Sequence, residues 1–152
     1  MIERPEIEEY LPHKDSMLLL DRIMDYDTEN NFLVSEVDTG DDDLFFNAEL
    51  NGIPAWTGFE YMAQSIAALS GVNARTLLGI EPKIGFIMSI RAFNTEIPAF
   101  PCGKTLQVRV SQIFNENSVV SFDCSIMLDS RIVTTAIVNA IEIDSVSEFL
   151  EN

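Results

Sequence analysis

The stretch that decides the fold runs over residues 58–69 and reads Gly58-Phe-Glu-Tyr-Met-Ala-Gln-Ser-Ile-Ala-Ala-Leu69. Its apolar residues recur at intervals of three and four, which is the spacing of one face of an α-helix. Alanines within it would let the backbone approach a sheet closely. Because Glu60 and Arg75 are nearly the only charges in this region, we expect a mostly buried helix that ends near Gly79.

The pattern changes to the alternation of β-strands on both sides of this helix. Downstream, alternating apolar and polar residues begin near Lys104, and turn residues at 115–117 and 129–130 divide the remainder into three antiparallel strands ending at Ile143. A further strand is expected from Lys83 to Phe93, and two more are expected as a hairpin over 17–26 and 31–38. This order predicts an α+β fold in which one antiparallel sheet of about six strands wraps one long central helix.

The chain's organisation predicts a single domain over residues 1–152 that pairs with another subunit. A chain of 152 residues can bury a sufficient core without a disulfide or a metal, and no Gly-, Pro- or Ser-rich linker interrupts it. A single sheet covers the helix on one side only. We therefore expect a dimer, in which two sheets join or two helices meet.

Charge and composition exclude several classes of function. With 9 basic and 25 acidic residues the formal charge is −16, which argues against nucleic-acid binding. Apolar runs are too short for a membrane span, and the acidic start Met1-Ile-Glu-Arg-Pro-Glu6 differs from a signal peptide, so a cytoplasmic protein is expected. Cys102, Cys124 and one His form no zinc or disulfide pattern, and Asp41-Asp42-Asp43 is interpreted as a solvated acidic loop. The sequence predicts no metal.

Glu60 has two explanations from spacing alone. Thr57 and Glu60 fit a capping box, in which each side chain bonds the other residue's backbone at the helix start, and spacing favours this explanation. Alternatively, Glu60 is a general acid or base at the mouth of an apolar tunnel.

The motifs Leu11-Pro-His-Lys-Asp-Ser-Met-Leu-Leu-Leu-Asp-Arg22 and Phe59-Glu-Tyr-Met-Ala-Gln64 occur in this order along the chain. They resemble the hotdog-fold 3-hydroxyacyl-acyl-carrier-protein dehydratases, which carry Leu-Pro-His-Arg, Leu-Leu-(Val/Leu)-Asp-Arg and Glu-Ala-Met-Ala-Gln. The segment 54–64 is more similar to the aryl-polyene-biosynthesis branch than to the housekeeping fatty-acid enzyme. Weaker similarity at 84–87 and 97–103 extends the resemblance over most of the chain.

The resemblance implies a hotdog fold, an obligate dimer with active sites at its interface, and reversible loss of water from a 3-hydroxyacyl thioester to give a trans-2-enoyl thioester. It implies no metal or redox cofactor. Housekeeping members carry a catalytic His in a Gly-His-Phe-Pro loop before the helix, whereas this chain reads Phe45-Phe-Asn-Ala-Glu-Leu-Asn-Gly52 there and has no His. The acid/base pair implied here is His13, the only imidazole, with Glu60 of the same or the partner subunit.

Four further residues are candidates for substrate binding. Gln64, one turn after Glu60, could orient its carboxylate, or it could be a surface or interface amide. Trp56 and Tyr61 could line the acyl tunnel, although large aromatics beside a buried helix more often only pack there. Gly58 would let a thioester oxygen approach backbone N–H groups, or it could reflect local backbone freedom.

The implied partners are an acyl-carrier-protein or coenzyme A thioester and a second hotdog chain, as a homodimer or a heterodimer. Both carriers are anionic, so the acidic chain needs local cations to bind them, or its acidic face recognises a basic protein. Two alternatives to the dehydratase remain open, which are an acyl-thioester hydrolase on the same fold and a non-catalytic subunit that stabilises an active partner. Candidate cations are Lys14, Arg75, Lys83 and Arg91.

Overall fold

The computed structural model describes residues 1–4, 6–11, 17–75, 84–117 and 119–143, with only the backbone at 84–88 and 142–143. One long helix, α1 (Gly58–Asn73), lies between strands that precede and follow it in the chain. Two short 3-10 helices are η1 (Glu6–Glu9) and η3 (Ala55–Thr57). The strands are β1 (Ile2–Glu3), β2 (Arg22–Asp27), β3 (Phe32–Asp38), β4 (Gly52–Pro54), β5 (Ile84–Thr95), β6 (Ala99–Pro101), β7 (Thr105–Glu116), β8 (Val119–Leu128) and β9 (Arg131–Ile143).

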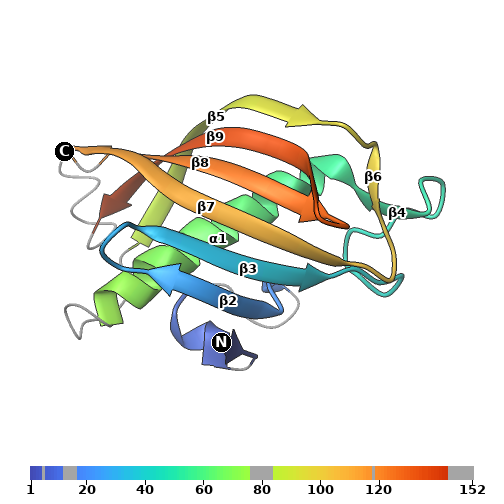
Figure 1. Ribbon diagram of the computed structural model, residues 1–152, viewed down its shortest axis with the longest axis horizontal. Helices are drawn as coiled ribbons and strands as arrows, with labels where there is room; N and C mark the ends of the chain where they lie inside the picture. The colour runs from blue at the N-terminus through green and yellow to red at the C-terminus, as the bar shows by residue number, and fades with distance from the viewer. Residues whose placement is uncertain (5, 12–16, 76–83, 118, 144–152) are drawn as a thin grey trace.

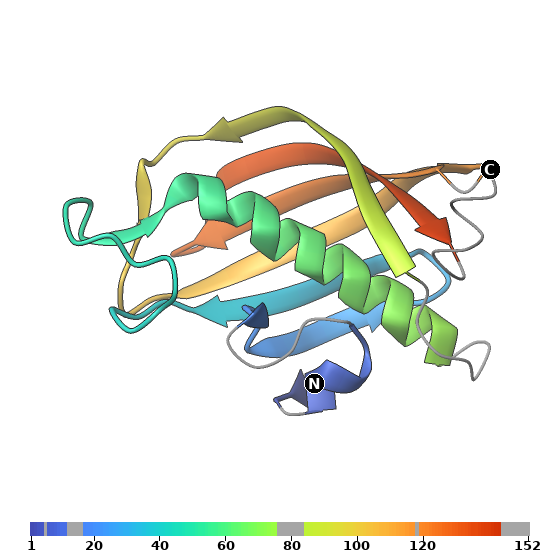
Figure 2. The ribbon, with the colours of Figure 1, turned by 180° about the vertical axis from the view of Figure 1, so that it is seen from behind.

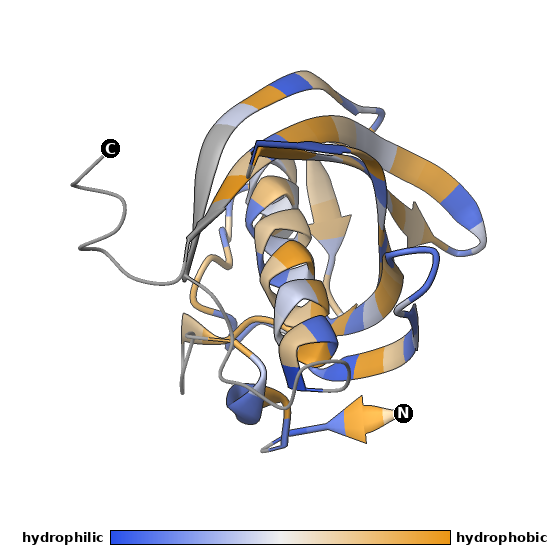
Figure 3. Cartoon of the chain, turned by 90° about the vertical axis from the view of Figure 1, so that its left-hand side faces the viewer, coloured by the Kyte–Doolittle hydropathy of each residue, from blue (hydrophilic) through white to orange (hydrophobic). Residues whose placement is uncertain are grey.

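Within the described ranges, seven strands form one antiparallel sheet in the order β1-β2-β3-β7-β8-β9-β5. The sheet curves around α1, which lies along its concave face and chiefly contacts β3 and β7 (Figures 1, 2 and 3). This confirms the hotdog arrangement expected from the sequence. The sheet has seven strands rather than about six, because β1 adds a two-residue edge beside β2.

The core forms between the apolar face of the sheet and the buried side of α1. Strand alternation places Leu106, Val108 and Val110 of β7 in the core and sends the intervening residues outward. Met62 and Leu69 on α1 pack against this face. Burial of this continuous apolar surface is the main force that holds the helix on the sheet.

The N-terminal segment approaches α1 very closely at Gly71. A Cβ atom built on Gly71 would lie 1.6 Å from the backbone oxygen of Tyr10, so the contact requires a residue without a side chain. Arg75 reinforces the same junction, because its Nε donates to the Glu9 carbonyl at 2.8 Å and its guanidinium lies 5.8 Å from the Tyr10 ring centroid.

Several expected boundaries need correction. The α-helix ends at Asn73 and continues as a π-helical turn through Arg75, whereas the expected stop at Gly79 lies outside the described residues and stays a prediction. The first hairpin begins at Arg22 rather than at position 17, because residues 18–20 form no ladder. A separate two-stranded sheet, β4 with β6, was not expected, since its three-residue strands are too short to show an alternating pattern. No helix among the described residues is long and apolar enough to cross a membrane.

Candidate functional site

A mostly apolar pocket lies beside the first turns of α1, and we call it the Glu60 pocket. Its volume is about 230 Å³. Helix residues Glu60 and Gln64 provide its polar groups, so a carboxylate and an amide face an otherwise hydrophobic space. The residues that line it are Met17, Leu19, Leu44, Phe45, Trp56, Phe59, Glu60 and Gln64.

Gln64 connects the helix to the segment that precedes β2. Its Oε1 accepts a hydrogen bond from the Leu19 N–H at 2.8 Å, and its Nε2 donates to the Met17 carbonyl at 2.8 Å. The same Nε2 donates to Oε1 of Glu60 at 3.3 Å. Gln64 is buried, so it is not the surface amide that the sequence left open, and the prediction that it orients Glu60 is consistent with this contact.

The helix start differs from the expected capping box. Thr57 makes no side-chain cap bond, and its buried Oγ1 has no hydrogen-bond partner among the described residues. Thr57 already has helical backbone angles, φ −59° and ψ −21°, because η3 runs directly into α1. A hydroxyl in this conformation is not placed as a cap usually is, so Thr57 does not supply the hydroxyl half of a capping box, while the expected bond from Glu60 to the Thr57 N–H stays a prediction.

Gly58 is buried at the junction of η3 and α1. A Cβ there would lie 2.9 Å from Cδ1 of Ile126 and 3.3 Å from Cζ of Phe100. Its backbone N–H already points to the carbonyls of Ala55 and Trp56. Close packing thus accounts for this glycine, and a thioester oxygen would have to compete for its N–H.

Trp56 lies at the rim of the Glu60 pocket and is 53% exposed. Its indole meets the Phe45 ring edge to face, with centroids 5.6 Å apart and an interplanar angle of 73°. Met17 and Leu44 on the same rim are also exposed, at 59% and 58%. The pocket therefore opens onto an apolar surface of this chain.

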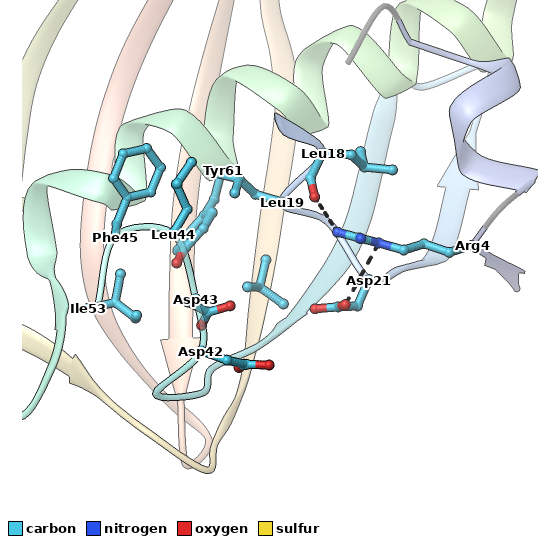
Figure 4. A pocket seen from close by; sticks show the side chains of 11 residues that line it. Arg4, Leu18, Leu19, Asp21, Asp42, Asp43, Leu44, Phe45, Ile53 and Tyr61 are labelled. Atoms are coloured by element: carbon cyan, nitrogen blue, oxygen red, sulfur yellow. Dashed lines mark hydrogen bonds and ion pairs between the residues drawn. The ribbon is translucent and has the colours of Figure 1, made fainter. Parts of the chain in front are cut away.

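A second pocket, which we call the Tyr61 pocket, adjoins the first. Its volume is about 280 Å³, and it shares Leu19, Leu44 and Phe45 with the Glu60 pocket. Arg4 lies at its edge, where it donates to the Leu18 carbonyl and pairs with Asp21 (Figure 4). It also donates to the Leu20 carbonyl. The complete lining is Arg4, Leu18, Leu19, Asp21, Val37, Asp42, Asp43, Leu44, Phe45, Ile53 and Tyr61.

Burial shifts the titration of the polar groups in the Tyr61 pocket. Desolvation is the largest cause of the raised pKa of Asp43 and of Asp21, partly offset by backbone N–H bonds from Gly40 and Asp38. Desolvation followed by the charges of Asp43 and Asp21 raises the pKa of the Tyr61 phenol. Tyr61 is therefore a protonated hydrogen-bond donor at neutral pH.

The structure brings together Trp56, Glu60 and Gln64 in one pocket, with Tyr61 in the adjoining one. His13 lies outside the described residues, so the expected His13–Glu60 pair stays a prediction.

Asp43 was missed at the sequence level, where residues 41–43 were assigned to a solvated loop. Asp41 and Asp42 are exposed as expected, but Asp43 is half-buried and lines the Tyr61 pocket. The direct join of the acidic run to Leu44-Phe-Phe46 was the available signal, since a carboxylate next to three apolar residues is easily carried inward. The described residues contain no cluster of His, Cys, Asp or Glu suited to a metal.

Comparison with known proteins identifies the family to which this chain belongs. The model of the ApeP-like family, described as ApeP dehydratase, matches residues 5–151. The dehydratase heterocomplex ApeI:P from Xenorhabdus doucetiae contains a chain with TM-score 0.85 and 24% identity, covering 95% of each chain.

Two further solved structures share the fold at lower identity. A hypothetical thioesterase with coenzyme A from Streptococcus pneumoniae has TM-score 0.63 and 10% identity, over 82% of this chain and 86% of that one. The PaaI protein from the phenylacetic acid degradation operon of E. coli has TM-score 0.60 and 13% identity, over 80% of this chain and 78% of that one. Because the family model matches residues 5–151, nearly the whole chain, this protein belongs to the ApeP-like family of dehydratases.

Proposed function

We propose that this chain is one subunit of a hotdog dimer that dehydrates 3-hydroxyacyl thioesters to trans-2-enoyl thioesters. The observation that carries the proposal is the Glu60 carboxylate, which faces an apolar pocket and receives a hydrogen bond from Gln64. An apolar pocket can take an acyl chain, and a carboxylate within it can exchange a proton with the reacting atoms.

The reaction needs a base that removes the α-proton and an acid that protonates the departing 3-hydroxyl. Glu60 supplies one of these groups, and His13 or a histidine of the partner subunit supplies the other. After the α-proton leaves, its electrons form the double bond to C3 as the C3–O bond breaks, and water departs with the proton from the acid. No group on the enzyme is oxidised or reduced.

A heterodimer is favoured over a homodimer by two features of the chain. Residues 45–52 contain no histidine, although the housekeeping dehydratases that this chain resembles carry one there, so a partner that has the histidine would complete the site. The apolar rim formed by Met17, Leu44 and Trp56 offers a surface for that partner to cover. The dehydratase heterocomplex of Xenorhabdus doucetiae is a precedent for such an assembly.

The carrier is proposed to be an acyl-carrier protein, in aryl-polyene or related fatty-acid-like biosynthesis in the cytoplasm. The two free thiols support a reducing compartment. Most of the described basic side chains form ion pairs with carboxylates, so this acidic chain offers little positive surface. We therefore propose that the partner provides the basic docking surface for the carrier. The ion pairs are Arg4–Asp21 (3.9 Å), Arg22–Glu36 (2.8 Å), Arg22–Asp38 (2.6 Å), Lys104–Asp129 (3.3 Å) and Arg131–Glu96 (3.3 Å).

The same missing loop histidine supports a second candidate, a non-catalytic subunit that stabilises an active partner. The two candidates differ in what Glu60 does. In the dehydratase, Glu60 exchanges a proton with substrate, whereas in the stabilising subunit its carboxylate is dispensable.

The test assays the chain alone and after addition of a second hotdog subunit, with a 3-hydroxyacyl thioester and enoyl absorbance as the readout. Glu60→Gln should lower the rate by about a hundredfold or more, while the exposed Glu96→Gln should leave it unchanged. A complex that keeps full activity with Glu60→Gln supports the stabilising role. Release of free thiol without enoyl formation would identify a hydrolase instead.

A further inference from the structure

The Tyr61 hydroxyl lies at the wall of the Tyr61 pocket and has no acceptor among the described residues. The side chain is only 3% exposed, and its ring packs against Phe100 with centroids 6.0 Å apart. The hydroxyl points away from α1 into the Tyr61 pocket, towards Asp43 and Ile53 (Figure 4). No other described residue forms a hydrogen bond with it, so the hydroxyl is available to a ligand in the pocket.

Asp43 supplies a matching acceptor in the same pocket. Its Oδ2 accepts the Gly40 N–H at 2.8 Å, while its Oδ1 has no hydrogen bond within the described part of the chain. Of the charges near Tyr61, Asp43 acts on the phenol most strongly, ahead of Asp21. The pocket therefore presents one unused donor and one unused acceptor that lie near each other.

The remaining charged groups of the pocket are already occupied. Arg4 donates to the Leu18 and Leu20 carbonyls, and Oδ2 of Asp21 accepts the Asp38 N–H at 2.7 Å. Asp42 is exposed at the rim. A ligand that enters the pocket thus meets Tyr61 and Asp43 as its available polar partners.

The chemistry of these two groups selects the ligand. A hydroxyl can accept the Tyr61 proton and donate its own to Asp43, so it satisfies both. A carboxylate or phosphate can only accept and would face three aspartates, and an ammonium can only donate and leaves Tyr61 unpaired. Apolar walls from Leu18, Val37 and Ile53 suit the alkyl portion of such a ligand.

We propose that Tyr61 and Asp43 form a binding site for a hydroxyl group carried by the acyl chain of the substrate. The proposal rests on the proposed function, because the acyl chain would reach this site past Leu19, Leu44 and Phe45, which the two pockets share. The hydroxyl is either the 3-hydroxyl that leaves in the reaction or one farther along the chain. Both sources present the same chemistry.

The experiment measures binding rather than turnover, by calorimetry on the complex with its hotdog partner and on the full chain alone. All variants are made in a Glu60→Gln background, so that the 3-hydroxy ligand is not consumed. Three acyl-pantetheine thioesters of equal chain length are compared, one saturated, one with a 3-hydroxyl and one with a terminal hydroxyl. One hydroxylated ligand should bind about tenfold more tightly than the saturated ligand. Which one does so identifies the position of the hydroxyl.

Tyr61→Phe should abolish this preference and Asp43→Asn, whose amide is a weaker partner than a carboxylate, should reduce it. Both variants should leave the affinity for the saturated ligand unchanged. The exposed Tyr26→Phe is the matched control and should retain the preference. Tyr61→Phe is expected to fold normally because no described partner loses a hydrogen bond, and its thermal unfolding checks this. Equal affinity for all three ligands, or a preference that survives Tyr61→Phe, would show that the pocket holds only water and would overturn the proposal. If the complex with Glu60 intact never dehydrates the 3-hydroxyacyl thioester, while the Glu60→Gln complex still prefers a hydroxylated ligand, the proposed function is refuted and this site stays in place.

Discussion

The side-chain amide of Gln64 and the carboxylate of Glu60 lie one helical turn apart on α1, with Nε2 of Gln64 3.3 Å from Oε1 of Glu60. The same amide holds the Met17 carbonyl and the Leu19 N–H, each at 2.8 Å. A single buried residue therefore orients the candidate catalytic group and fixes one wall of its pocket.

Replacing this amide should damage stability and activity together. Gln64→Leu keeps a similar volume but leaves the Leu19 N–H and the Met17 carbonyl without partners, at a cost of about 2 kcal/mol or more. Urea unfolding measures the loss. Gln107→Leu, at an exposed position of β7, is the control and should change stability by less than about 0.5 kcal/mol. A Gln64→Leu variant that is as stable as the wild type would show that these two hydrogen bonds do not hold the segment to α1.

Gly71→Ala should destabilise the protein, although alanine is the better helix former by about 1 kcal/mol. The added Cβ would lie 1.6 Å from the Tyr10 oxygen, so the N-terminal segment must move away from α1. We expect a net loss of about 1–3 kcal/mol, as for other overpacked sites, measured by thermal unfolding. Ser70→Ala, one position earlier on the same helix, should have no such penalty. A stabilised Gly71→Ala would show that this contact is loose.

Asp43→Asn should increase stability at neutral pH. Burial raises the pKa of Asp43 above its ordinary value of 3.8, so the folded protein binds this proton more tightly than the unfolded chain does. Stability contributed by this group is therefore highest in acid and falls as the pH rises through the folded pKa. The asparagine variant should exceed the wild type in thermal stability at about pH 7, and this gain should disappear below pH 3.8.

The exposed Asp42→Asn controls for the removal of one negative charge from an acidic chain. It should raise stability less than Asp43→Asn does. If the two variants gain equally, general charge repulsion rather than burial of Asp43 explains the effect.

The two thiols should differ in reactivity. Burial, reinforced by Asp123, raises the pKa of Cys124 to about 12, while Cys102 is partly exposed. A thiol-specific reagent should therefore modify one cysteine in the native protein and both in denaturant. Mass spectrometry after digestion should place the native label on Cys102. Rapid native labelling of Cys124 would show that β8 opens readily.

Trp56 should report the binding of a hotdog partner. It is the single tryptophan of the chain and is 53% exposed at the rim of the Glu60 pocket. Burial beneath a partner should shift its fluorescence to shorter wavelength, and Trp56→Ala should weaken the complex. Ile132→Ala, on the β8–β9 hairpin, removes another exposed apolar side chain and should leave the affinity unchanged. An unchanged emission spectrum in a formed complex would place the interface elsewhere.

Sequence patterns were sufficient where the physical cause is local. The turn at Asp129 and Ser130 was predicted from residue type, and both residues have positive φ, 52° and 65°, as a tight hairpin turn requires. The helix was predicted because its apolar residues recur at helical spacing, and its low charge indicates that it is buried on several sides. These signals lie within a few residues along the chain.

The site was predicted only in part, because it is assembled from distant segments. Glu60 and Gln64 were found because they share one helix face. The roles of Arg4 and Asp43 depend on how the N-terminal segment and the loop before β4 fold back onto the helix. No spacing between positions 4, 43 and 61 indicates that contact, since it arises only after the sheet has curved.

Among the described strands, the twelve-residue β5 lies at one end of the sheet, and this position determines how the chain should be handled in the laboratory. Unpaired backbone groups on such a strand can recruit any extended polypeptide nearby, so a subunit synthesised by itself risks precipitating. Producing it together with its companion from one plasmid would let the two chains assemble before the edge of β5 recruits another polypeptide.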